Sequence, residues 1–153
     1  MRAILLSLAF GMLALGACES APEAEEPVVI SLSRGPCFGT CAIYVVTING
    51  DGSAVYEGKR FVAVTGRQEY RVPAADVAAL VAKFKAANFF SLKDQYRANV
   101  TDLPTYVISL TLGERTKTVT DYAGLMVGMP KAVADLEAEV DRVGQTARFV
   151  KGN

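Results

Sequence analysis

The chain has 153 residues with no histidine, no tryptophan and three cysteines, and its 16 basic and 16 acidic side chains give a formal net charge of zero. This length suits one domain with a single core. Without a basic excess there is no field to attract nucleic acid, so nucleic-acid binding is not expected. The lack of histidine removes Ser-His-Asp and Cys-His nucleophile sites and the usual catalytic zinc sites.

Residues 1–17 form a short leader in which one basic residue precedes an apolar stretch and two small residues. This is the pattern of a secretory signal peptide, and it falls short of the roughly 20 apolar residues of a transmembrane helix. Residues 15–18, Leu-Gly-Ala-Cys, resemble the bacterial lipobox, in which the leader is cut before a cysteine whose sulfur receives diacylglycerol. We therefore expect lipidation of Cys18. The alternative is a plain secretory peptide cut near Ala17 or Ala21, which leaves Cys18 either discarded or as an odd thiol.

Residues 18–27 are acidic, contain proline and have no apolar period, so we expect a flexible, extended tether. Two or more acyl chains hold a protein firmly on a membrane. Lipoproteins with aspartate after the cysteine tend to stay in the inner membrane, and Glu19 here favours the outer membrane, with the domain facing the periplasm. The expected partner is this membrane, through the N-terminal lipid, and an envelope protein is a further candidate partner.

From residue 28 the pattern becomes that of β-strands. The run 28–34 is short and apolar, and the run 41–48 alternates, with Tyr44, Val46 and Ile48 on one face. The Asn-Gly-Asp-Gly stretch at 49–52 predicts a tight hairpin, because these residues accept positive φ angles. Residues 53–72 continue the meander.

The remaining residues predict two helices separated by a second hairpin. Apolar residues at helical spacing follow Pro73 and, later, Pro130; they are Val77, Leu80, Val81 and Phe84 in the first helix and Val133, Leu136, Val140 and Val143 in the second. Between the helices, 91–104 reads as an ordered loop, and 105–112 and 115–121 as strands joined at Gly113-Glu114.

The order of four strands, helix, two strands, helix predicts an α+β domain over 28–150, with a mainly antiparallel sheet of about six strands and two helices packed on it. The turns are too short for parallel crossovers.

Cys37 and Cys41 stand four positions apart ahead of a predicted strand. On the exported side of a membrane such a pair ends as a disulfide, and with Cys18 lipidated the cysteine count is even. So small a loop predicts about 2 kcal/mol of stabilisation. A redox-active pair is the alternative, although the spacing is one longer than Cys-x-x-Cys and no helix follows. Two sulfurs without further soft ligands predict neither a metal site nor a cofactor.

The loop 91–104 is the most polar candidate for a binding site. Its candidate residues are Lys93, Asp94, Tyr96, Arg97, Thr101 and Asp102. Asp94 and Asp102 could act as an acid and base pair, with Tyr96 or Arg97 polarising a substrate. In the structural alternative, Asp102 caps a turn and Arg97 orders the loop by pairing with a carboxylate.

Four stretches together resemble a small bacterial family known as domain of unknown function 6438. They are 30–62 with its Gly-Pro-Cys-Phe-Gly-Thr-Cys motif, 89–97, the segment around Thr-Asp-Leu-Pro at 101–104, and Asp-Tyr-Ala-Gly at 121–124. The resemblance covers residues 30 to about 150 and departs at Ala42, where family members commonly have proline. It implies an exported, compact domain and no particular activity.

These observations predict a non-enzymatic envelope lipoprotein whose domain binds a protein or serves as a structural module. The alternative is a thiol-active or hydrolytic periplasmic protein that uses Cys37 and Cys41 or the Asp94 and Asp102 loop. A further possibility is an inhibitor-like module whose loop fills the cleft of another protein.

Overall fold

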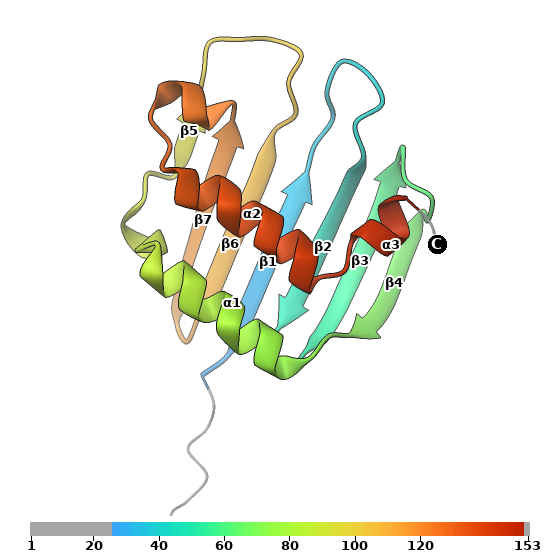
Figure 1. The fold of residues 1–153 in the computed structure, drawn as a ribbon, viewed down its shortest axis with the longest axis vertical. Coiled ribbons are helices and arrows are strands. Elements are labelled where there is room, and N and C mark those ends of the chain that lie inside the picture. The colour runs from blue at the N-terminus through green and yellow to red at the C-terminus, as the bar shows by residue number, and fades with distance from the viewer. Residues whose placement is uncertain (1–25, 152–153) are drawn as a thin grey trace, which may run out of the picture.

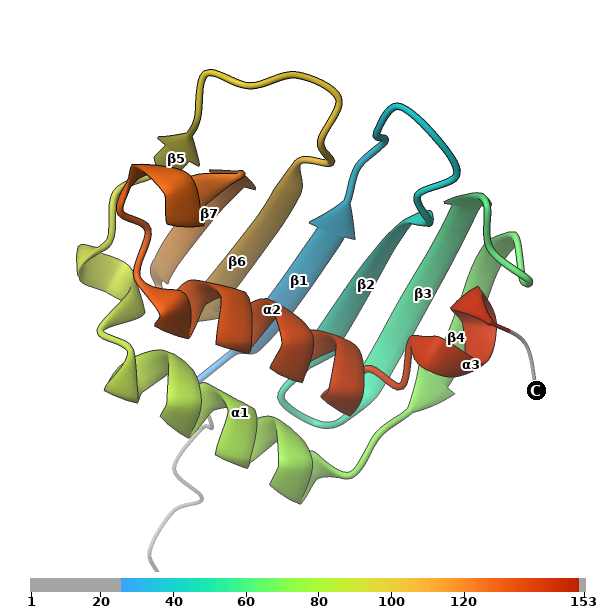
Figure 2. The ribbon, with the colours of Figure 1, turned by 45° about the horizontal axis from the view of Figure 1, so that its top comes forward.

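A seven-stranded sheet and three helices form two layers, with every helix on the same face of the sheet (Figures 1 and 2). The structure is a computed structural model that describes residues 26–151. The predicted signal peptide 1–17, Cys18 and most of the tether 18–27 lie outside the described residues.

The strand order across the sheet is β4-β3-β2-β1-β6-β7-β5. The strands are β1 (Val28–Arg34), β2 (Ile43–Asn49), β3 (Ser53–Arg60), β4 (Gly66–Arg71), β5 (Gln95–Arg97), β6 (Tyr106–Leu112) and β7 (Arg115–Tyr122). All neighbours are antiparallel except β5 and β7, which are parallel.

Strand β1 occupies the middle of the sheet, between β2 and β6. Its alternating pattern buries Ile30 and Leu32 under the helices, while Ser31 points to the other face. The register pairs Arg34 with Tyr106, so the connections that follow β1 and precede β6 leave the sheet at the same end.

The helices are α1 (Ala74–Ala86), α2 (Lys131–Val143) and α3 (Ala147–Val150), and short 3₁₀ turns lie at η1 (Phe89–Ser91) and η2 (Gly124–Val127). Pro73 and Pro130 stand directly before α1 and α2, as predicted, where their fixed φ suits a helix start. No helix among residues 26–151 is long and apolar enough to cross a membrane.

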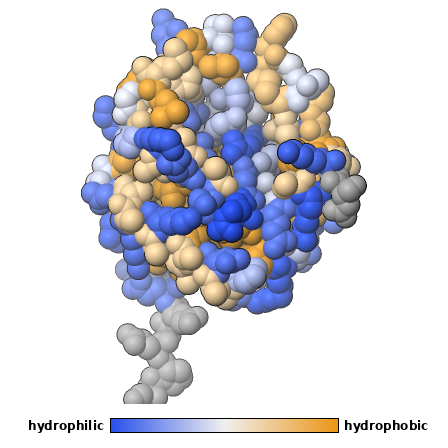
Figure 3. Space-filling model, viewed as in Figure 1, coloured by the Kyte–Doolittle hydropathy of each residue, from blue (hydrophilic) through white to orange (hydrophobic). Residues whose placement is uncertain are grey.

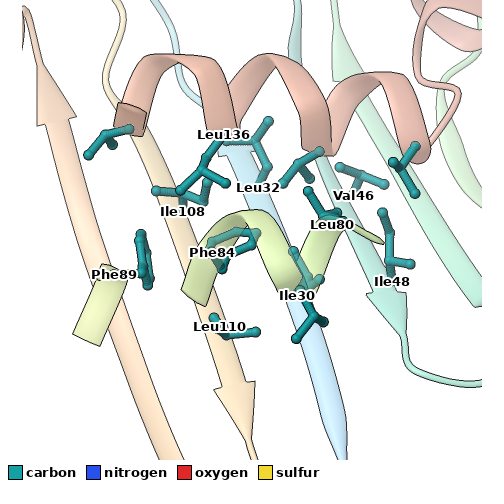
Figure 4. Close-up of a cluster of buried hydrophobic side chains, with 14 of the residues drawn as sticks. Ile30, Leu32, Val46, Ile48, Leu80, Phe84, Phe89, Ile108, Leu110 and Leu136 are labelled. Carbon is teal, nitrogen blue, oxygen red and sulfur yellow. The ribbon is translucent and has the colours of Figure 1, made fainter. Parts of the chain in front are cut away.

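The core lies between the helices and the sheet (Figure 4). Phe84 of α1 is fully buried and meets Phe89 edge to face, with 4.8 Å between ring centroids. Leu80 lies on the same stripe of α1, and Leu136 of α2 is buried in the same core (Figure 4). The apolar residues predicted for both helices are therefore the ones that cover the sheet.

The predicted α+β class is confirmed, but the expected number and arrangement of elements needs correction. The predicted loop 91–104 contains β5, whose parallel pairing with β7 was not anticipated. Only Tyr96 of this strand is buried, since Gln95 and Arg97 are exposed, and three residues show too little alternation to read as a strand. A third helix, α3, was also missed.

Replacing Phe84 with alanine should lower the free energy of unfolding by about 3 to 5 kcal/mol, because it leaves a cavity between α1 and the sheet. Urea unfolding followed by tyrosine fluorescence measures this. The exposed control Phe61→Ala should change stability by about 0.5 kcal/mol or less. Equal losses for both variants would contradict this account of the core.

Candidate functional site

Two segments far apart in the sequence meet at one end of the sheet. The connection 35–42 follows β1, and the connection 98–105 leads into β6 (Figure 1). The backbone N–H of Gly35 donates to the carbonyl of Thr105 at 2.8 Å, and that of Phe38 donates to the carbonyl of Asp102 at 3.2 Å. We call the surface that these two connections share the composite loop surface.

Local geometry explains why these residues form it. A Cβ on Gly35 would lie 2.8 Å from the carbonyl oxygen of Thr105, so the close approach of the two segments requires glycine. The sulfur atoms of Cys37 and Cys41 lie at disulfide distance, with 5.8 Å between the Cα atoms. Asp102 has a left-handed φ of 71°, and its carboxylate accepts a hydrogen bond from the Thr101 hydroxyl.

The composite loop surface presents large apolar side chains to solvent. Phe38 is 88% exposed and Leu103 is 44% exposed. The same end of the sheet carries the other exposed large hydrophobic residues of the described chain, which are Phe61, Leu125, Met126 and Val127. Hydrophobic residues reach the surface among the loops at the top of Figure 3. Exposed apolar side chains on neighbouring segments, as with Phe38 and Leu103, are typical of interaction surfaces.

A polar cluster beneath this surface joins β1 to α2. The Nε of Arg34 donates to Asp141 at 2.8 Å, and the guanidinium lies 4.2 Å from the centroid of the Tyr106 ring. The hydroxyls of Tyr44 and Thr146 donate to the other oxygen of Asp141 at 2.7 and 2.9 Å. Arg34 directly precedes Gly35, so the cluster fixes the point where the first segment leaves the sheet.

The ionisation of Arg34 and Tyr44 reflects their shared neighbour. Burial alone lowers the pKa of Arg34, but the Asp141 carboxylate, Tyr44 and Tyr106 together outweigh the burial, and the pKa is raised. Burial, then Asp141, raises the pKa of Tyr44. Arg34 therefore stays charged and Tyr44 stays a hydrogen-bond donor, as the cluster requires.

Glu137 is a buried acid next to this cluster. It is 3% exposed, and its Oε1 has no hydrogen-bond partner among the described residues. Burial, followed by repulsion from Asp121 and Asp141, raises its pKa to about 7, against the opposing effect of Arg34. The sequence analysis missed Glu137, although it stands four residues after Val133 on the apolar stripe of α2 and so at a position that points inward.

The structure does not bring Asp94 and Asp102 together. Asp94 precedes β5 and pairs with Lys117 of β7 at 2.5 Å, whereas the Asp102 carbonyl accepts from Phe38. Asp94 is itself largely in solvent. An acid and base pair acting on one bond therefore has no geometric support.

The other predicted loop residues have mainly structural contacts. Lys93 lies 5.9 Å from the ring of Tyr96, and the Tyr96 hydroxyl accepts from the Lys93 backbone. Arg97 stacks over Tyr122 at 4.9 Å, which replaces the carboxylate pairing expected for it. Only Thr101 and Asp102 of the predicted set belong to the composite loop surface.

A comparison with protein families covers the segments 35–42 and 98–105 that form the composite loop surface. A family profile described as domain of unknown function DUF6438 matches residues 28–144, which is more than half of the chain. The chain belongs to the DUF6438 family. A search of curated proteins found no match. The DUF6438 region runs from β1 to just past α2 and contains both segments of the composite loop surface.

The raised pKa of Glu137 predicts a pH-dependent stability. The unfolded chain ionises this acid near its ordinary pKa of 4.5, whereas the folded chain holds the proton until about 7. Stability should therefore fall as the pH rises from about 4.5 to about 7, by up to about 3 kcal/mol, and then level off.

Glu137→Gln should remove the fall in stability between pH 4.5 and pH 7, because glutamine keeps the shape of the acid without its charge. Urea unfolding at pH 5 and pH 8 measures the difference for this variant, the unmodified chain and Glu114→Gln, an exposed control. The same pH dependence in Glu137→Gln as in the unmodified chain would show that the fall has another source.

Proposed function

We propose that this DUF6438 chain is a non-enzymatic, lipid-anchored protein of the cell envelope that binds a protein partner through the composite loop surface. The observation that carries the proposal is the exposure of Phe38 beside Leu103 on two segments that are hydrogen-bonded to each other. When a partner covers an exposed phenylalanine on an ordered loop, apolar area leaves water and the free energy of the complex is lowered.

The fixed geometry of the segments supports a binding role. Phe38 stands between two cysteines whose sulfurs lie at disulfide distance, and its own N–H is bonded to Asp102. A disulfide there would limit the conformations open to the free loop. Binding then costs less conformational entropy than it would for a flexible loop, and aromatic anchors held in this way commonly dominate interface energies.

The direction of β1 supports the anchoring part of the proposal. The described chain enters the sheet at Val28, at the end opposite to the composite loop surface (Figure 1). A lipid on Cys18 would be joined by the tether 18–27 to that opposite end. The composite loop surface would then be free to point away from the anchoring membrane.

The partner-binding proposal is tested by the double variant Phe38→Ala, Leu103→Ala. Co-purification from detergent-solubilised membranes should recover a specific partner with the unmodified protein and about 10-fold less or none with the double variant, because both apolar contacts are lost. Phe61→Ala is the matched control, since Phe61 lies at the same end of the sheet but on the β3–β4 turn. Repeated recovery of no partner, or equal recovery by the double variant, would refute the proposal.

The anchoring proposal is tested by Cys18→Ala. The unmodified protein should partition with membranes and carry the added mass of acyl chains, whereas the variant should lose both. Mass spectrometry and membrane fractionation provide the measurements. Membrane partition by the variant, together with an unmodified mass for the natural sequence, would rule out the lipid anchor.

A further inference from the structure

The second face of the sheet has no covering element among residues 26–151. All helices lie on the other face (Figures 1 and 2). Alternation along the strands turns a regular set of side chains outward here, and the register aligns Thr118, Ser109, Ser31 and Thr47 in one row across four strands. We call this surface the open face.

The centre of the open face is uncharged. The outward positions of β7, β6, β1 and β2 hold only serine, threonine, valine, isoleucine, asparagine and tyrosine. Valine side chains flank the hydroxyl row, at Val29, Val45 and Val107. Charged side chains of both signs appear only toward the edges, as with Glu57 on β3 and Arg97 on β5. An uncharged centre with a charged rim agrees with the depletion of charged residues at the core of protein interfaces.

Two pairs of hydroxyl groups on the open face bond to each other. Ser31 and Ser109 share a hydrogen bond of 2.7 Å, and Thr111 and Thr116 share one of 2.9 Å. Buried polar groups are costly chiefly when they lose their partners. These two pairs keep their hydrogen bonds when water leaves the face, so covering them has a low free-energy cost.

We propose that the open face is a homodimer interface, in which two copies of this chain pack their sheets face to face. The six long strands, spaced about 4.8 Å apart with about six residues each at about 3.3 Å, give a face of about 29 by 20 Å, or about 600 Å² before side-chain relief is counted. A standard interface buries about 800 Å² on each partner. Two such faces would bury about 1,200 Å² in total, which is the lower end of the range of standard interfaces.

The uncharged centre favours a second copy as the occupant. Where two identical faces meet about a two-fold axis, residues on the axis contact their own copies, so a charge there would face the same charge. The centre of the open face holds no charged residue and causes no such repulsion. A different partner would also be selected most readily by charge complementarity, and the centre offers no charge for that purpose.

The axis of the dimer follows from the positions of the chain ends. Sheets that pack face to face keep their strands within about 30° of each other. A two-fold axis along the strands places both Val28 residues at one end and both composite loop surfaces at the other. An axis across the strands would place them at opposite ends. This choice of axis, though not the dimer itself, rests on the proposed lipid anchor, because the first arrangement places both tethers on the side of one membrane and both composite loop surfaces away from it.

Sedimentation velocity of the full chain purified from membranes, corrected for bound detergent, tests the dimer over about 1 to about 100 µM. The unmodified protein should have the mass of two chains at the upper concentrations. Thr47→Arg, which places two like charges at the centre of the interface, should be a monomer. Ala79→Arg, on the exposed side of α1, should remain a dimer.

Val107→Glu on β6 provides a second face variant if Thr47→Arg does not fold by circular dichroism. A monomeric mass for the unmodified protein would overturn the proposal, whether solvent or its own residues 1–25 cover the face. An undiminished dimer in a folded face variant, or a different protein bound at the face, would also overturn it. Loss of the dimer with retained partner binding would leave the proposed function standing.

Discussion

The pairing of β1 with β6 is the constraint on which the rest of the structure depends. Strand β1 begins a meander of four strands, and β6 begins the hairpin that follows α1, so this ladder joins the two halves of the sheet. The same ladder pairs Arg34 with Tyr106 and so places Gly35 against Thr105. A shift of one residue would turn Ile30 and Leu32 away from the helices, which ties the register to burial of the core.

The polar cluster beneath the loops connects this ladder to the helical layer. Asp141 accepts hydrogen bonds from Arg34, Tyr44 and Thr146, and so links two strands to the end of α2. A half-buried carboxylate with this many donors is well compensated for its loss of water. The Oε1 of Glu137 has no partner within residues 26–151, and burial favours the neutral form of this acid, which makes Glu137 the pH-sensitive member of the region.

Much of the fold could be predicted from the sequence because the spacing of apolar residues indicates which side chains are buried. Val46 and Ile48 alternate on a strand, Leu136 and Val140 recur at helical spacing, and all four lie in the core. The composite loop surface could not be predicted in the same way. Its two segments are brought together by the β1–β6 register. The hydrogen bond from Phe38 to Asp102 joins two backbones, so it does not depend on side-chain types that a sequence pattern could show. The sequence analysis therefore placed a binding site in the later loop alone.

The central claim is that Phe38 and Leu103 belong to one partner-binding surface. Photo-crosslinking in intact producing cells tests it directly, with a photoreactive phenylalanine analogue placed at position 38 in one strain and at position 103 in another. Position 79, on the exposed side of α1, serves as the control. The account predicts that positions 38 and 103 yield adducts with the same partner protein and that position 79 does not. Adducts with different proteins at the two positions, or none at either, would contradict it.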